Sequence, residues 1–218
     1  HGYSLETAGN LIRATRVGSA DILARAAKGE FMRTGRLLEM GAQGIMYPRC
    51  SDASEAKEVV RWTKFAPLGQ RGFDGAGADA FYTSIPMDEY VRDANEETFV
   101  VIQLEEPKAV EQAEAIAAIE GVDVIMLGPA DFSVLSGIPG QFDHPSIEKS
   151  LNKIAQAAAD TGKHWACIAA DADSAKELLD RGARMVLHNA DICIVKKGLE
   201  TMRDDFSKLG FQFQDNPI

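Results

Sequence analysis

The stretches TFVVIQLEEP, residues 98–107, and GVDVIMLGPADFS, residues 121–133, decide the fold. Each begins with a short apolar run rich in β-branched residues and then changes abruptly to polar or turn-forming residues. The segment between them repeats alanine, valine and isoleucine at helical spacing. Apolar runs of this length on either side of a helix are typical of strands buried on both faces of a parallel sheet. The two stretches therefore predict a strand–helix–strand unit.

Two carboxylates, Glu105 and Asp131, follow the two predicted strands. Because parallel strands end at the same edge of a sheet, we expect both side chains at the carboxyl edge, where such folds hold their active sites. Neighbouring carboxylates repel each other unless a cation lies between them, and Mg²⁺ or Mn²⁺ is the simplest candidate. The alternative interpretation is a solvated Glu105 at the strand end and an Asp131 that caps the short helix FSVLS.

The alternation of strand and helix continues along the whole chain. Six strands, each followed by a helix, are expected at residues 19–25, 44–48, 99–104, 122–127, 164–169 and 184–188. Such a pattern gives either a doubly wound open sheet or a (β/α)8 TIM barrel. No nucleotide-binding glycine motif follows any strand. Polar residues end several strands instead: Arg25, Arg49, Glu105, Asp131 and His188.

This distribution of polar strand ends favours an α/β protein of the (β/α)8 barrel type. We expect one barrel domain over residues 1–218, incomplete at its N-terminus, with the first one or two strands before His1. Residues 67–86 form a long loop rich in glycine and aspartate. Since no helix follows the GQRGFDGAG segment at once, we interpret this loop as a flexible lid rather than a phosphate cradle.

Composition excludes several classes of function. The net charge of −10 argues against a nucleic-acid partner, which needs a basic surface. No apolar run approaches the roughly 20 residues of a membrane span, and no signal peptide is visible. The three cysteines are few and widely spaced, which fits a reducing compartment. A cytoplasmic protein is expected.

Other side chains near the predicted strand ends are candidates for chemistry. Arg25 closes a strand, and its guanidinium is suited either to a bidentate grip on a carboxylate or to a surface salt bridge. Gln103 shares a strand face with Glu105 and would hold substrate or a metal-bound water, or pack as a polar group. Lys28 is the nearest approach to a Schiff-base lysine, so metal chemistry is favoured over an iminium. A glycosidase pair is disfavoured by the 7% aromatic content.

Three segments carry a resemblance to a known family: GAQGIMYPRCSDASEAKEVVRWTKFAPLGQRGF at 41–73, VVIQLEEPKAVEQAEAIAAIEGVDVIMLGPADFS at 100–133, and DRGARMVLHNAD at 180–191. The sequence resembles the metal-dependent pyruvate aldolases of the 4-hydroxy-2-oxoheptanedioate and dehydrodeoxyglucarate aldolase group from His1 to about Phe206. Within that group, LEEP and RGFDGAG are most similar to the macrophomate synthase type, which decarboxylates oxaloacetate and adds the enolate to a 2-pyrone.

The resemblance implies a (β/α)8 barrel, often hexameric, that uses Mg²⁺, or Mn²⁺ or Co²⁺ in its place. By motif, Glu105 and Asp131 match the metal ligands and Gln103 matches the polar residue beside them. Arg25 matches the arginine that holds the pyruvyl group. Ala130, in the GPAD motif with Asp131, is implied in substrate binding.

The resemblance also assigns a role to His1, which matches the histidine of an acid/base pair. The aspartate of that pair would lie before His1. The implied function is a Mg²⁺-dependent carbon–carbon lyase or synthase that works through a metal-bound pyruvate enolate, with oxaloacetate decarboxylation coupled to attack on an electrophile such as a 2-pyrone. The alternatives are a reversible pyruvate–aldehyde aldolase and a non-catalytic barrel that binds a keto acid. The expected partners are small-molecule substrates and copies of the same chain, with neither nucleic acid nor membrane.

Overall fold

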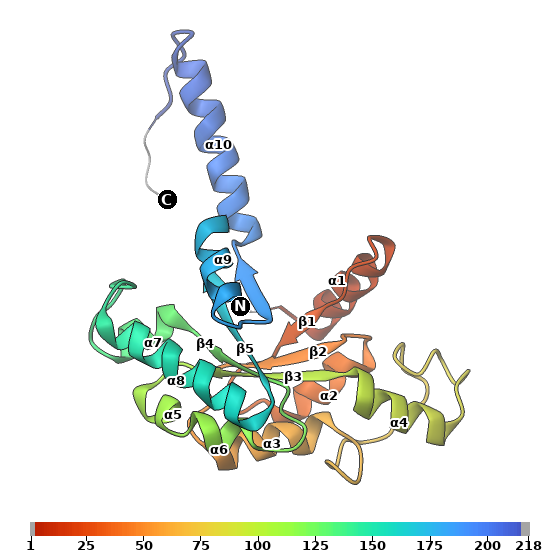
Figure 1. The fold of residues 1–218 in the computed structure, drawn as a ribbon. Helices are drawn as coiled ribbons and strands as arrows, with labels where there is room; N and C mark the ends of the chain where they lie inside the picture. The colour runs from red at the N-terminus through yellow and green to blue at the C-terminus, as the bar shows by residue number, and fades with distance from the viewer. Residues whose placement is uncertain (1–2, 215–218) are drawn as a thin grey trace.

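The computed structural model describes residues 3–214, so the predicted role of His1 lies outside the described residues. One parallel sheet crosses the molecule (Figure 1). Its strands are β1 (Leu23–Arg25), β2 (Gly44–Tyr47), β3 (Phe99–Leu104), β4 (Val124–Leu127), β5 (His164–Ala169) and β6 (Met185–His188). All six predicted strands are therefore confirmed, although several are shorter than the sequence pattern suggested.

The strands lie in the sheet in the same order as in the chain, and each pairs in parallel with the next. A doubly wound sheet reverses its strand order at a switch point, so that alternative is wrong. Sequential order is the arrangement of a (β/α) barrel. Over residues 3–214, however, β1 and β6 are the two edges of an open sheet. The α/β class is confirmed, and closure into eight strands stays a prediction.

Helices follow the strands as the alternation predicts. The helices within residues 3–214 are α1 (Leu5–Val17), α2 (Phe31–Glu39), α3 (Ala53–Thr63), α4 (Met87–Glu97), α5 (Pro107–Glu111), α6 (Ala113–Ala117), α7 (Pro129–Leu135), α8 (Pro145–Thr161), α9 (Ala172–Asp180) and α10 (Asp191–Ser207). The prediction of a single helix between β3 and β4 is wrong. Two short helices, α5 and α6, lie there, because Gln112 leaves the helical conformation at φ −101° and ψ 13°.

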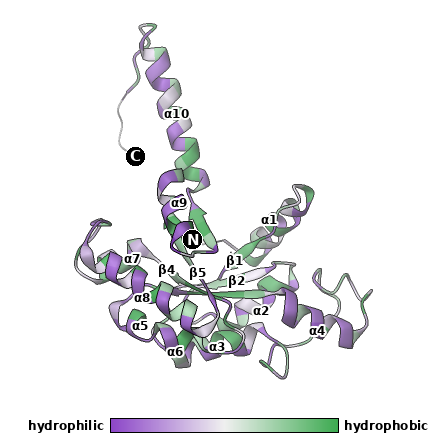
Figure 2. Cartoon of the chain, viewed as in Figure 1, coloured by the Kyte–Doolittle hydropathy of each residue, from purple (hydrophilic) through white to green (hydrophobic). Residues whose placement is uncertain are grey.

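The two faces of the sheet bury different side chains. Alternate residues of β3 and β4, Val100, Ile102, Leu104, Ile125 and Leu127, join the main core with residues of α3, α6 and α8. The residues between them, including Val101 and Met126, form a separate apolar cluster on the other face with Met46 of β2 and Ala166 of β5. The strands are coloured mainly as hydrophobic in Figure 2, whereas α4 is mainly hydrophilic. The alternation of side chains along β3 and β4 between the two faces determines which strand-end side chains point away from the main core.

The loop over residues 67–86 lies near the amino ends of the strands, whereas Glu105 lies at their carboxyl ends. The Ala78 N–H donates to Glu39 O at the end of α2 (2.9 Å), and the Gln70 N–H donates to Arg61 O near the end of α3 (2.6 Å). The end of α2 leads into the amino end of β2, which is the edge away from the strand-end carboxylates. The interpretation of this loop as a lid over the site of the same chain is therefore wrong.

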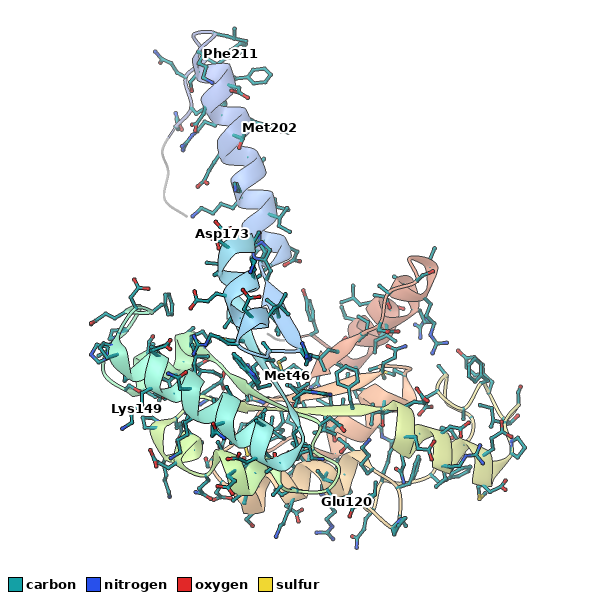
Figure 3. All side chains as sticks on the ribbon, in the orientation of Figure 1. Met46, Glu120, Lys149, Asp173, Met202 and Phe211 are labelled. Atoms are coloured by element: carbon teal, nitrogen blue, oxygen red, sulfur yellow. The ribbon has the colours of Figure 1, made fainter. Side chains whose placement is uncertain are left out.

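The last helix stands away from the sheet, as the positions of Met202 and Phe211 in Figure 3 show. None of the α10 residues is buried. Apolar residues recur along it every three or four positions: Ile192, Val195, Leu199, Met202 and Phe206. An exposed apolar stripe of this kind is typical of a surface that packs against another protein chain. No helix among the described residues is long and apolar enough to cross a membrane.

Candidate functional site

The two central strands bring the predicted carboxylates to one edge of the sheet. Leu104 of β3 pairs in register with Leu127 of β4, so Glu105 and Gly128 are the next residues beyond the two strands. Asp131 lies in the first turn of α7, which begins directly after Gly128. Gly128, and not Asp131, occupies the N-cap position, so the capping alternative is wrong. The predicted proximity of Glu105 and Asp131 is confirmed, because both line the same cleft.

Glu105 is buried, with 2% of its surface exposed. Its Oε2 accepts a hydrogen bond from the Arg49 N–H at 2.7 Å. Burial raises the pKa of Glu105, and the nearby Asp131 carboxylate raises it further, while the Arg49 N–H and the charges of Arg25 and Arg49 oppose the rise. A solvated strand-end residue would not be buried in this way. Glu105 is a desolvated carboxylate whose charged form a cation would stabilise.

Arg25 and Gln103 reach each other across the carboxyl ends of β1 and β3. Arg25 Nη1 donates to Gln103 Oε1 at 3.4 Å. Gln103 is buried, with 3% exposed, and lies two residues after Val101 on the sheet face opposite the main core. The side chain of Gln103 therefore lies on the sheet face opposite the main core, as predicted, and its place inside a closed barrel stays a prediction. Its amide thus holds one edge of the Arg25 guanidinium and leaves Arg25 on the wall of the cleft.

The cleft has a volume of about 740 Å³. Polar side chains from the ends of β1, β2 and β3 and from α7 line it together with apolar side chains of α1 and α2, and the polar ones include Arg25, Arg49, Glu105 and Asp131. Ala130 is exposed beside Asp131, and it is not among the lining residues. His188 Nδ1 lies 3.0 Å from the carbonyl oxygen of Ala169 on β5, outside the cleft.

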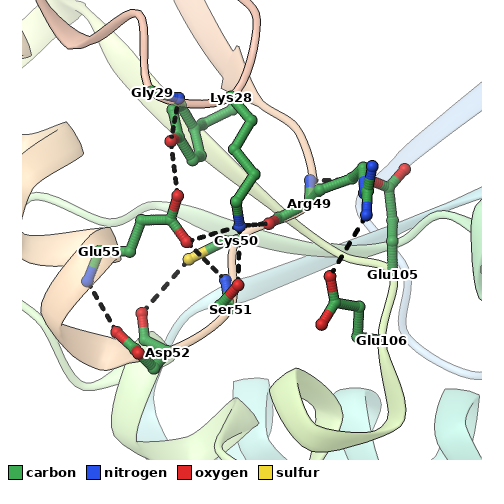
Figure 4. Close-up of polar contacts among 10 residues, drawn as sticks. Lys28, Gly29, Arg49, Cys50, Ser51, Asp52, Glu55, Glu105 and Glu106 are labelled. Atoms are coloured by element: carbon green, nitrogen blue, oxygen red, sulfur yellow. Dashed lines mark hydrogen bonds and ion pairs between the residues drawn. The ribbon is translucent and has the colours of Figure 1, made fainter.

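A second polar cluster ties the loops after β1 and β2 together (Figure 4). Lys28 Nζ donates to Ser51 Oγ (2.7 Å), to Glu55 Oε2 (2.9 Å) and to the Arg49 carbonyl. The hydroxyl of Tyr47, a buried residue, accepts from the Gly29 N–H at 2.8 Å and donates to Glu55 Oε1 at 2.7 Å. This network fixes the main chain around Arg49, whose N–H holds Glu105.

Sequence reasoning considered Lys28 only as a possible Schiff-base lysine and missed its partners Tyr47 and Glu55. Glu55 resembles an exposed residue in the first turn of α3, and Tyr47 resembles an ordinary core residue of β2. The cluster forms only because the loop after β1, which carries Lys28 and Gly29, packs against the end of β2 and the start of α3. The one usable signal was the spacing of a lysine three residues after β1 and a glutamate in the first turn after β2, which places opposite charges at the same edge.

The site offers oxygen ligands for a hard divalent cation. Glu105 and Asp131 supply carboxylates, and Mg²⁺ commonly takes one or two carboxylates and completes its shell with waters and substrate oxygens. No group of three histidine, cysteine or acidic side chains that would suit a metal occurs among residues 3–214. The donor set therefore fits Mg²⁺ or Mn²⁺ and does not fit a closed zinc site. The observation that favours a cation here is the buried Glu105 carboxylate, which the nearby, exposed Asp131 carboxylate repels.

Comparison with known proteins identifies relatives. The chain is 32% identical to the hydroxypyruvate/pyruvate aldolase of Delftia acidovorans over 174 residues, which cover 79% of this chain and 64% of that protein. It is 32% identical to the 4-hydroxy-2-oxovalerate aldolase of Novosphingobium aromaticivorans over 163 residues, covering 75% and 61% respectively. The chain thus spans a little under two thirds of the length of these relatives.

Solved structures agree with the sequence comparison. The crystal structure of an HpcH/HpaI aldolase from Desulfitobacterium hafniense has a TM-score of 0.87 at 30% identity, over 99% of this chain and 82% of that one. Macrophomate synthase has a TM-score of 0.81 at 23% identity, over 95% and 75%, which shows a shared fold alone. The sequence model of one family, HpcH/HpaI aldolase/citrate lyase, matches residues 11–195. The chain therefore belongs to the HpcH/HpaI aldolase/citrate lyase family, and the predicted resemblance to pyruvate aldolases is confirmed.

Proposed function

We propose that the protein is a carbon–carbon lyase that forms the enolate of pyruvate at the cleft between Arg25, Glu105 and Asp131. The observation that carries this proposal is the pair of carboxylates at adjacent strand ends, one of them buried, beside a guanidinium held by Gln103. Family membership and relatives named as aldolases support it. The proposal includes a single eight-stranded barrel domain in which two further strands join the six described ones.

A divalent cation held by Glu105 and Asp131 would supply Lewis-acid stabilisation of the negative charge that collects on the keto oxygen. Arg25 binds the carboxylate of the pyruvyl group, for which a planar guanidinium is suited. Its charge is fixed before the reaction begins, and such preorganised groups contribute several kcal/mol at a site with little water. Gln103 positions Arg25 through the 3.4 Å hydrogen bond.

Two routes lead to the enolate. In decarboxylation of oxaloacetate, the bond between C3 and the departing carboxylate breaks, CO₂ leaves, and its electron pair stays on the three-carbon fragment. In aldol cleavage, a base removes the hydroxyl proton and an aldehyde leaves with the same result. The enolate then takes a proton or attacks an electrophile. We propose the decarboxylating synthase with an electrophile such as a 2-pyrone as one specialisation, and a reversible pyruvate–aldehyde aldolase as the other.

His1 is proposed as the base for aldol cleavage on the motif match alone, since it lies outside the described residues. Ala130 is proposed as a substrate contact beside Asp131 on the same ground. We also propose that the protein is a homo-oligomer. No residue of α10 is buried against the rest of residues 3–214. The apolar stripe along this helix therefore supports a second copy of the chain as its partner.

An assay panel tests the proposed function. The protein is given oxaloacetate alone, then oxaloacetate with a 2-pyrone, then pyruvate with a series of aldehydes, each with Mg²⁺ and with a chelator. We expect metal-dependent consumption of oxaloacetate or formation of an aldol product. Binding of pyruvate without turnover of any of these substrates would favour the non-catalytic keto-acid-binding barrel instead.

A further inference from the structure

We propose that Lys28 is a positioning residue of this site. It holds the main chain of Arg49 in the one conformation that directs the Arg49 N–H at the Glu105 carboxylate. This inference rests on the proposed function, because it takes Glu105 as a ligand of the divalent cation. Lys28 acts through Arg49 and is not itself a ligand of the cation.

The main chain of Arg49 is in a strained conformation. Its φ is +51°, in the left-handed region that side chains with a β-carbon disfavour. In this conformation the Arg49 N–H donates to Glu105 Oε2 at 2.7 Å. A return of φ to the right-handed or extended region would turn the peptide that carries this N–H relative to the peptide that follows. The N–H would then no longer point at Glu105.

The hydrogen bond to Glu105 matters because it fixes a buried carboxylate. Glu105 is 2% exposed and lines the cleft with Arg49. A carboxylate that is held at one oxygen presents its other oxygen in a fixed direction, which prepares it to bind a cation. The conformation of Arg49 therefore determines the direction of the proposed metal ligand.

The peptide after Arg49 is held on both of its sides. On one side, the Cys50 N–H donates to the main-chain oxygen of Gln103 on β3 at 3.1 Å. On the other side, the Arg49 carbonyl accepts a hydrogen bond from Lys28 Nζ. A bond from an ammonium group is stronger than one between neutral groups. Lys28 thus supplies the charged contact that opposes relaxation of the strained residue.

The Lys28 ammonium group is itself held in place. An ammonium group has three donors, and here they meet three acceptors of the protein. Besides the Arg49 carbonyl, these are Ser51 Oγ at 2.7 Å and Glu55 Oε2 at 2.9 Å (Figure 4). With its donors directed into the protein, Lys28 is suited to fix the main chain rather than to bind substrate.

A buried tyrosine completes the network. The Tyr47 hydroxyl donates to Glu55 Oε1 at 2.7 Å and accepts from the Gly29 N–H at 2.8 Å. The Glu55 carboxylate is therefore tied to the Lys28 side chain through one oxygen and to the main chain of the next residue through the other. Lys28 is anchored at both ends, and the loop after β1 cannot move without disturbing Arg49.

Titration calorimetry with Mn²⁺ in the absence of substrate tests this role. Lys28→Met keeps the length and apolar stem of the side chain and removes its donors. We expect it to bind Mn²⁺ about tenfold more weakly than the parent, while circular dichroism shows a folded protein. Lys153→Met is the matched control, because Lys153 forms an ion pair with Glu111 and is 37% exposed, against 38% for Lys28. It should bind Mn²⁺ as the parent does.

The rate of exchange of the pyruvate methyl protons, measured at increasing Mn²⁺ concentration, separates positioning from a direct role. In Lys28→Met we expect the Mn²⁺ concentration for half-maximal rate to rise about tenfold, with a smaller change in the maximal rate. Unchanged Mn²⁺ affinity with a large fall in the maximal rate would show that Lys28 acts on the substrate, and would overturn its role as a positioning residue.

A double-mutant cycle with Arg49→Gly tests the route through the main chain. Glycine adopts the left-handed conformation without a steric cost, so it should keep the N–H directed at Glu105 without help from Lys28. We therefore expect Lys28→Met to weaken Mn²⁺ binding much less in the Arg49→Gly background than in the parent.

The possible failures are distinguishable. If the parent binds Mn²⁺ and Lys28→Met binds it equally well, the role of Lys28 is wrong and the proposed function stands. The same conclusion follows if Lys28→Met weakens binding equally in both backgrounds. If the parent binds no Mn²⁺, both are overturned.

Discussion

Gly128 lies so close to Glu105 that a β-carbon added to the glycine would stand 2.2 Å from Glu105 Oε1 and 2.6 Å from its Cγ. Gly128 follows the last residue of β4 directly and lies opposite Glu105 when the register of β3 and β4 is continued by one residue. Its φ of −97° is available to any residue, so the backbone does not demand glycine there. The glycine is required because the buried carboxylate occupies the space of a side chain.

Gly128→Ala should therefore displace the Glu105 carboxylate and weaken binding of Mg²⁺ or Mn²⁺ by about 10- to 100-fold, the usual effect of disturbing the support of a metal ligand. Titration calorimetry with Mn²⁺ measures this directly. Gly198→Ala is the matched control, because a β-carbon at Gly198 in α10 would meet no atom within 4 Å. Equal metal affinity in Gly128→Ala and the parent would show that Glu105 does not hold the cation.

Arg25→Ala should lower kcat/KM for oxaloacetate or pyruvate by about 10²-fold or more, since the fixed positive charge near the developing enolate is lost. Arg25→Lys should recover only part of the loss, because an ammonium cannot reproduce the paired donors of a guanidinium. Steady-state kinetics in the presence of Mg²⁺ give both values.

Gln103→Leu provides a check on the same assignment. It removes the amide that bonds Arg25 at 3.4 Å but leaves the arginine in place. We expect a smaller loss of kcat/KM than in Arg25→Ala. Normal kinetics in both Arg25 variants would make Arg25 a structural residue.

Treatment with pyruvate and borohydride should leave every lysine unmodified. A Schiff base requires an uncharged, accessible amine, whereas Lys28 Nζ is bound by Ser51 Oγ and by the Glu55 carboxylate at 2.7 and 2.9 Å. Mass spectrometry of the treated protein is the measurement. A stable adduct on Lys28 would show that the enzyme works through an iminium.

The Glu55 carboxylate should make the stability of the protein depend on pH. Burial favours its neutral form, but hydrogen bonds from the Ser51 N–H, the Tyr47 hydroxyl and Lys28 outweigh that effect, so the pKa of Glu55 is lowered below its ordinary 4.5. A carboxyl whose pKa is lower in the folded than in the unfolded protein stabilises the fold above the unfolded pKa. This contribution is lost as the pH falls through the folded pKa.

Urea unfolding of the parent and of Glu55→Gln tests this expectation. The difference in unfolding free energy should be largest near about pH 7 and should shrink as the pH falls below about 4.5. Glu58→Gln, which removes an exposed carboxylate from the same helix, controls for the loss of charge alone. A difference between parent and Glu55→Gln that stays constant across this range would show that Glu55 makes no pH-dependent contribution.

Most of the fold follows from local patterns in the sequence. The apolar runs of β3 and β4 are buried on both faces, so their periodicity identified them without ambiguity. The order of the strands was less certain, because alternation of strands and helices is shared by barrels and doubly wound sheets. The break at Gln112 and the position of the 67–86 loop depend on contacts with α2 and α3, which no local pattern reports.

Some features of the candidate site were likewise predictable from the sequence, and others were not. Glu105, Asp131 and Arg25 were predictable because each lies at or just after the end of a strand, where parallel topology brings distant residues together. The steric role of Gly128 was not predictable, and the Lys28–Glu55 contact was signalled only by opposite charges after neighbouring strands, because both arise from packing between loops. The left-handed conformation of Arg49 also lies beyond sequence patterns, since arginine does not favour it.

The proposed enolate chemistry is tested most directly by exchange of the methyl protons of pyruvate in deuterated water, followed by NMR. This exchange needs no second substrate and no knowledge of the electrophile. We expect the parent protein to catalyse the exchange with Mg²⁺ or Mn²⁺, and we expect the exchange to stop when a chelator is added. Glu105→Gln and Asp131→Asn should abolish both the exchange and metal binding while circular dichroism shows a folded protein. Exchange that persists without metal, or in both variants, would contradict the assignment of Glu105 and Asp131 as the metal ligands of a pyruvate lyase.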